Sequence, residues 1–114
     1  MNEAEIINKL LHSDLIKQTY TAKSGQILRI ELPKIPMTRH TQFVGLKRET
    51  HGDVNSFVET PRENAGEGII APVEIRGKAV HSGTVNFTLT AIDRISGEDI
   101  PDVKPLNITV NIKE

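Results

Sequence analysis

The chain has 114 residues, the length of a single domain, and its 14 basic and 15 acidic side chains give a formal charge of −1. It contains no cysteine, which excludes disulfides, zinc–thiolate sites and cysteine nucleophiles. Because there is no basic excess and the few aromatic residues are scattered, neither nucleic acid nor a membrane is expected as a partner.

Residues 1–17 predict a short amphipathic helix followed by a linker. Asn2 is a candidate N-cap, and Glu5 completes a capping box three residues later. Apolar residues follow at helical spacing: Ile6, Ile7, Leu10, Leu11 and Leu15. Because so short a helix is marginal alone, we expect it to cover one edge or end of the next domain; a partner-binding helix is the alternative. The acidic start does not fit a secretory leader, so a soluble chain is expected.

From residue 18 to residue 114 the apolar pattern changes to a period of two, which is typical of strands with one buried face. Alternation is strong in three segments and weaker in four: 28–32, 85–91 and 106–112, then 18–23, 41–48, 54–59 and 71–80. These seven segments predict one all-β domain, either an antiparallel β-sandwich or a small barrel.

The lengths of the connections indicate where a binding surface lies. If each strand runs antiparallel to its neighbour in sequence, successive connections alternate between the two ends of the domain. Tight turns containing glycine, at 24–25, 50–53 and 81–83, then close one end. Three long connections gather at the other end: 33–40, 60–70 and 93–104. Long loops in a small domain are usually functional or disordered. We therefore expect a loop-based binding surface; three unrelated loops are the alternative.

Charge and stiffness differ between these loops. The first loop carries Lys34 and Arg39 and no acidic residue, whereas acidic residues outnumber basic ones in the third. Pairing between the two loops is favoured over binding of a polarised partner. Pro36 stands between Ile35 and Met37, and apolar residues stiffened by proline are typical of contact residues.

Motifs for catalysis or metal binding are not apparent. The four histidines lack the close spacing that holds a metal ion: His12, His40, His51 and His81. The acidic run 93–99 does not match a calcium loop. Gly66-Glu67-Gly68 is too short to hold a phosphate and indicates a turn, or a place where a partner backbone comes close. We therefore expect no enzyme activity, no cofactor and no metal.

Several segments occur in an order found in one family. Residues 24–33 read Ser-Gly-Gln-Ile-Leu-Arg-Ile-Glu-Leu-Pro, a loop with proline and threonine follows, then a Gly-x-Gly loop, and then Gly-Thr-Val-Asn-Phe-Thr at 83–88 before a long loop and a final alternating strand. Over about residues 18–113 the chain thus resembles the chagasin-type inhibitors of papain-like cysteine peptidases. At the position of the family's Asn-Pro-Thr-Thr-Gly signature, residues 35–39 read Ile-Pro-Met-Thr-Arg, so Pro36 and Thr38 match it. Arg94 stands for the arginine of the family's Arg-Pro-Trp loop, and the chain has no tryptophan.

This resemblance implies an immunoglobulin-like β-sandwich whose three loops at one end occlude the peptidase cleft. The partner-contacting residues that it implies are Ile35, Pro36, Met37, Thr38, Arg39, Gly66, Glu67, Gly68 and Arg94. Thr38 would lie near the catalytic thiolate, and Met37 or Ile35 would fill an apolar subsite. The alternative is a non-enzymatic immunoglobulin-like module for protein interaction or assembly. A monomer and a weak dimer both fit the sequence, and its compartment is not indicated.

Overall fold

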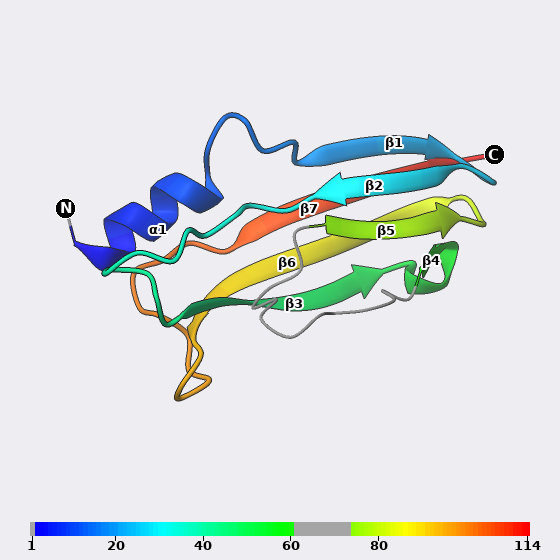
Figure 1. The fold of residues 1–114 in the computed structure, drawn as a ribbon. Helices are drawn as coiled ribbons and strands as arrows, with labels where there is room; N and C mark the ends of the chain where they lie inside the picture. The colour runs from blue at the N-terminus through cyan, green and yellow to red at the C-terminus, as the bar shows by residue number, and fades with distance from the viewer. Residues whose placement is uncertain (1, 61–73) are drawn as a thin grey trace.

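The structure is a computed structural model that describes residues 2–60 and 74–114. Within these residues a short helix precedes seven strands (Figure 1). Their bounds are α1 Glu3–Leu11, β1 Thr19–Lys23, β2 Ile27–Glu31, β3 Val44–Gly52, β4 Phe57–Glu59, β5 Glu74–Ala79, β6 Gly83–Asp93 and β7 Leu106–Lys113, with a 3₁₀ turn at Val54–Ser56 before β4. The all-β expectation is therefore confirmed.

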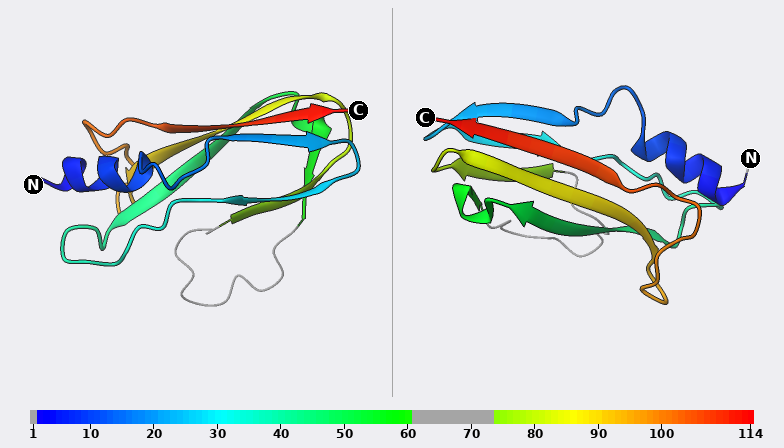
Figure 2. Two further views of the ribbon diagram at one scale, coloured as in Figure 1. Left: turned by 90° about the horizontal axis from the view of Figure 1, so that it is seen from above. Right: turned by 180° about the vertical axis from the view of Figure 1, so that it is seen from behind.

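The strands form two sheets that face each other. One layer has the order β1-β7-β6-β3, and the other has the order β2-β5-β4. The view from above separates the four-stranded layer from the three-stranded one (Figure 2). Among the described strands no ladder joins the two layers, so the domain is a β-sandwich rather than a closed barrel.

The sheets are antiparallel except at one pair of strands. β1 runs parallel to β7, with Thr19 opposite Thr109 and Lys23 opposite Lys113, whereas the other four ladders are antiparallel. The expectation of a purely antiparallel sandwich is therefore wrong at this edge. When each strand reverses the direction of the strand before it, the first and the seventh run the same way, so their pairing has to be parallel.

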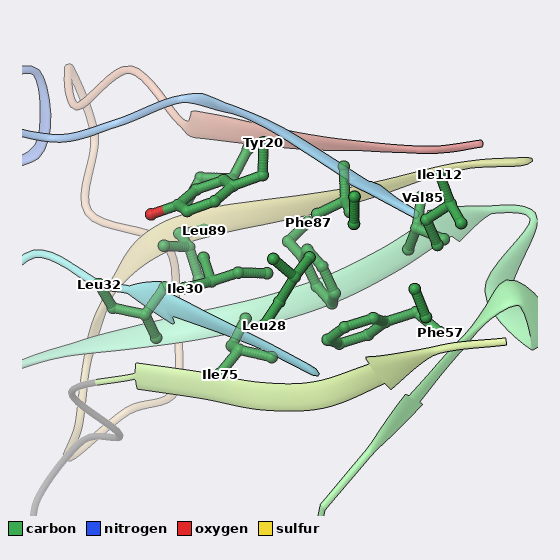
Figure 3. Packing of buried hydrophobic residues seen from close by; sticks show 14 of the residues in the cluster. Tyr20, Leu28, Ile30, Leu32, Phe57, Ile75, Val85, Phe87, Leu89 and Ile112 are labelled. Atoms are coloured by element: carbon green, nitrogen blue, oxygen red, sulfur yellow. The ribbon is translucent and has the colours of Figure 1, made fainter. Parts of the chain in front are cut away.

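Alternate side chains of both sheets fill the interior (Figure 3). β6 and β7 contribute the largest share, with side chains at most 4% exposed: Val85, Phe87, Leu89, Leu106, Ile108, Val110 and Ile112. The three-stranded sheet faces them with Leu28, Ile30, Phe57, Ile75 and Ala79. The rings of Phe57 and Phe87 meet edge to face with centroids 6.0 Å apart. The apolar residues that alternate in the sequence are thus the ones that face the core.

The outer face of β6 and β7 is polar and hydrogen-bonded. Three cross-strand pairs join threonine hydroxyls to asparagine side chains over distances of 2.8 to 3.1 Å: Thr84–Asn111, Thr109–Asn86 and Thr88–Asn107. Such directly opposed pairs stabilise a sheet without apolar burial. The threonine and asparagine residues that alternate with the core residues therefore support the same two strands from outside.

β3 is longer and β4 is shorter than the alternation predicts. Residues 50–52, expected in a turn, remain paired with β6. β3 ends at Gly52, which has a φ of 86° and where an added Cβ would lie 2.5 Å from the carbonyl oxygen of Thr84. The Asp53 carboxylate then accepts a hydrogen bond from Thr84 N at 2.9 Å, and the 3₁₀ turn leaves three residues for β4. Both faces of β3 are exposed beyond Leu46, so no apolar alternation marks its second half.

Phe87→Ala is expected to lower the free energy of unfolding by about 3 to 5 kcal/mol, because it empties the space of a fully buried ring. Urea denaturation followed by circular dichroism measures the change. Val58→Ala is the matched control, since that side chain is 56% exposed and its truncation should cost less than about 0.5 kcal/mol. Equal losses for the two variants would contradict the position of Phe87 at the centre of the core.

Candidate functional site

Two of the three long connections meet at one end of the sandwich. The first residue of β3, Val44, pairs with the last residue of β6, Asp93. Beyond this pair, Arg94 N donates to the carbonyl oxygen of Phe43 at 2.8 Å. Residues 32–43 and 94–105 therefore leave the sheets side by side, and α1 lies at the same end (Figure 1). We call this the helix-bearing end.

α1 begins at the expected cap and is attached by its apolar side. The side chain of Asn2 accepts a hydrogen bond from Glu5 N at 2.9 Å, as the capping pattern predicts. Ile7 and Leu11 are fully buried against Val44 and Ala91. Partly buried residues of both connections and of β3 complete this second cluster: Ile35, Ile100 and Val103 from the connections, and Leu46 from β3. The helix therefore covers one end of the sandwich, which is where the sequence placed the binding loops.

Hydrogen bonds tie α1 to the β6–β7 connection as well. The Asn8 amide donates to the carbonyl oxygen of Asp102 and accepts from Lys104 N, both at 2.9 Å. His12 Nε2 donates to the carbonyl oxygen of Lys104 at 2.7 Å. Asp102 has a φ of 66°, a left-handed conformation that few residues other than glycine adopt. The helix and its C-cap residue, His12, therefore hold this loop on both sides of a residue with an uncommon backbone conformation.

The β2–β3 connection is braced from within. The Thr41 hydroxyl, in a residue that is 3% exposed, donates to the carbonyl oxygen of Pro36 and lies 2.8 Å from the Thr38 hydroxyl. Thr38 N bonds to both Pro36 O and Thr41 Oγ1, at 3.0 and 3.1 Å. These contacts close the segment into a compact turn with Met37 at 65% exposure. Thr41 is the residue that sequence reasoning missed; its only signal is a hydroxyl three residues after Thr38.

The β6–β7 connection begins with a second compact turn. Oδ1 of Asp93 accepts from Ile95 N at 2.8 Å and from Ser96 N at 3.3 Å. Gly97, with a φ of 76°, donates its N–H to the carbonyl oxygen of Asp93 at 2.7 Å. Ile95 is therefore held at the tip with 76% of its surface exposed. The expected contact set did not include it.

Arg94 joins the two loops. An added Cβ at Gly45 would lie 2.8 Å from Arg94 Cγ, so the stem of the arginine lies directly over this glycine. Its guanidinium donates to the carbonyl oxygen of Gln42 in the β2–β3 connection. Arg94, expected as a partner contact, thus has a structural role between the loops. A larger residue at position 45 would therefore require the arginine side chain to shift.

The remaining expected contact residues fall into three groups. Ile35 is half-buried in the cluster beneath α1, so it helps to attach the helix. Pro36, Met37, Thr38 and Arg39 are exposed on the braced turn. Gly66, Glu67 and Gly68 lie outside the described residues. Phe43, 49% exposed beside Arg94, is a further apolar residue at this end that the expected contact set did not include.

The charges of the two loops do not pair with each other as expected. Asp99 forms its ion pair with Lys47 of β3, at 3.1 Å. Lys34 and Arg39 have no ion-pair partner within residues 2–60 and 74–114. A cleft of about 420 Å³ beside the start of α1 has acidic residues in its lining: Glu3, Asp93, Glu98, Asp99 and Asp102. The helix-bearing end is therefore basic on one loop and acidic on the other.

No family model, curated protein or solved structure matches this chain. Among the side chains that the structure describes, no group of three or more histidines, aspartates and glutamates is arranged to hold a metal ion. None of the described helices has the length and apolar character needed to span a bilayer.

Asn8→Ala is expected to loosen α1 selectively, because it removes both hydrogen bonds to the β6–β7 connection. The free energy of unfolding should fall by about 1 to 2 kcal/mol, and amide hydrogen exchange in α1 should accelerate more than in β6 or β7. Lys9→Ala, on the exposed side of the same helix, is the control. Equal protection of α1 amides in both variants would refute the role of Asn8.

Proposed function

We propose that this protein is a non-catalytic protein-binding domain that contacts its partner through the helix-bearing end. The observation that carries the proposal is the pair of large apolar side chains, Met37 and Ile95, held in solvent on two hydrogen-bonded turns. An apolar side chain on a rigid turn loses little conformational entropy when it enters a pocket. The packed core between the two sheets supports both turns.

The finer architecture that we propose is immunoglobulin-like. In the seven-stranded form of that fold the first, second, fifth and fourth strands make one sheet, and the third, sixth and seventh strands make the other. The orders β2-β5-β4 and β7-β6-β3 agree with this arrangement, whereas β1 differs from it, because it pairs with β7 and not with β2. The order supports the proposal because only a few of the ways to connect seven strands produce it.

The specific form of this function that we propose is inhibition of papain-like cysteine peptidases. Its support is the resemblance of residues 18–113 to chagasin-type inhibitors and the exposed turn at residues 36–39, with Met37 at its tip. Met37 would enter an apolar subsite, and the brace from Thr41 would keep the turn from adapting to the catalytic thiolate as a substrate does. Protease–inhibitor interfaces of standard size are among the tightest known.

α1 lies outside the segment that resembles the inhibitors, and it restricts which peptidases could bind. The helix lies between the two connections, buries Ile35 and fixes residues 102–104. A peptidase that receives Met37 and Ile95 must therefore also accommodate the helix beside its cleft. The second candidate, a non-inhibitory assembly module, is favoured by a different observation: none of the described strands covers the outer edge of β3.

Titration of a panel of papain-like peptidases with the purified protein tests the inhibitor function. We expect tight, reversible inhibition that Met37→Ala weakens by roughly tenfold or more, since a central apolar anchor carries a large share of the binding energy. Val58→Ala is the control, because Val58 is also apolar and exposed but lies on β4, and it should leave inhibition unchanged.

Lack of inhibition of every enzyme at about 10 μM protein, a weak affinity for an inhibitor, would refute the peptidase proposal. Inhibition that Met37→Ala leaves intact would instead refute the assignment of the β2–β3 turn as the contact.

A further inference from the structure

Among the described strands, β3 has the longest edge without a neighbouring strand. β3 pairs with β6 along all nine of its residues, and it is the last strand of its sheet. Among the described residues no strand pairs with its other side. From Lys47 onward its side chains are exposed on both faces of the sheet. Such an edge is a template for another strand, because its N–H and C=O groups await partners.

The hydrogen bonds at the two ends of β3 show which backbone groups point outward. Arg94 N donates to Phe43 O at 2.8 Å, and Asp53 N donates to Thr84 O at 2.9 Å. Odd-numbered residues of β3 therefore bond to β6. Bonding direction alternates along an antiparallel strand, so even-numbered residues direct their N–H and C=O groups away from the sheet. These are Val44, Leu46, Arg48, Thr50 and Gly52.

The side chains on this edge alternate in sign in a self-complementary way. Lys47 and Glu49 lie on the same outer face of the sheet, on either side of Arg48. Charges on an edge strand usually prevent edge-to-edge pairing. A second β3 related by a two-fold axis at Arg48 reverses that effect, because Lys47 then lies opposite Glu49 of the partner subunit, and Glu49 lies opposite Lys47 of the partner subunit.

We infer that two copies of this chain associate by antiparallel pairing of their β3 strands, centred on Arg48. In this register Leu46 and Thr50, both with outward backbone groups, lie opposite each other across the axis. A two-fold axis at Lys47 or at Glu49 would keep the hydrogen bonds but place like charges directly opposite each other. The complementary charges of Lys47 and Glu49 therefore favour the axis at Arg48 over an axis at either of these two residues.

Arg48 does not oppose this pairing. Its guanidinium lies 2.5 Å from Oε1 of Glu59 on β4 and 5.8 Å from the centroid of the Phe87 ring. The two Arg48 side chains that approach each other at the axis are therefore each paired with Glu59 of their own chain, which offsets their repulsion. β2 also ends its sheet, but it offers only five residues and is followed closely by Pro33, which has no N–H to donate.

The product is a dimer with one continuous eight-stranded layer, and its two helix-bearing ends point in opposite directions. This inference is independent of the proposed inhibitor function, because β3 pairing leaves Met37 and Ile95 exposed. The test is sedimentation equilibrium from roughly 10 to 500 μM, a range that covers weak dimers.

We expect a concentration-dependent dimer whose dissociation constant rises about tenfold in Lys47→Glu and also in Glu49→Lys, since each change places like charges opposite each other twice. The double variant Lys47→Glu/Glu49→Lys should restore wild-type affinity. Two controls should dimerise as the wild type does. Lys113→Glu makes the same lysine-to-glutamate change on β7 of the same sheet, away from the edge of β3. Asp99→Asn removes the intramolecular ion-pair partner of Lys47.

Thr50→Pro removes one outward N–H without touching the ladder to β6, and it should give a folded monomer by circular dichroism and sedimentation. A wild-type protein that remains monomeric over the whole range would overturn the proposal. So would a dimer that Lys47→Glu leaves unchanged, or a double variant weaker than either single one.

Discussion

Burial of the alternating apolar face of β6 and β7 is the interaction on which the rest of the molecule depends. Phe87 and Ile108, both fully buried, lie opposite each other at the centre of this face. The remaining strands either pair with these two or pack over them. The opposite face of the same two strands carries the threonine–asparagine pairs. The same two strands therefore form the core on one face and a hydrogen-bonded surface on the other. The pairing of β6 with β3 also places the two long loops at the same end of the sandwich.

The sequence predicted the features that a repeating apolar pattern encodes and missed those that arise only when distant segments meet. All seven strands were located. The alternation of connections between the two ends of the domain also placed two of the long loops together, and the third lies outside the described residues. The second half of β3 was missed because both of its faces are polar, and pairing with β6 alone holds it in the sheet. The contact of Arg94 with Gly45 depends on two strands that come together only after folding. Thr41 likewise is recognisable only once its hydroxyl is seen to close the turn.

α1 makes the loops and the core into one unit. The sequence predicts its cap and its apolar side but not its position, since many ends and edges of a sandwich can receive a short amphipathic helix. In the structure Ile7 and Leu11 extend the core beyond the sheets, and Asn8 holds the following loop through its backbone. A change in the helix is therefore transmitted to the β6–β7 connection through direct contacts, without passing through the core between the sheets.

The parallel pairing of β1 with β7 has a mechanical consequence. β1 begins near α1, and β7 ends at the opposite extremity of the sandwich (Figure 1). A pull applied to the two termini would first peel away the helix and would then draw β1 and β7 past each other along their lengths. In that geometry the ladder from Thr19 to Lys23 bears the tension in shear, so its hydrogen bonds have to yield together rather than one after another.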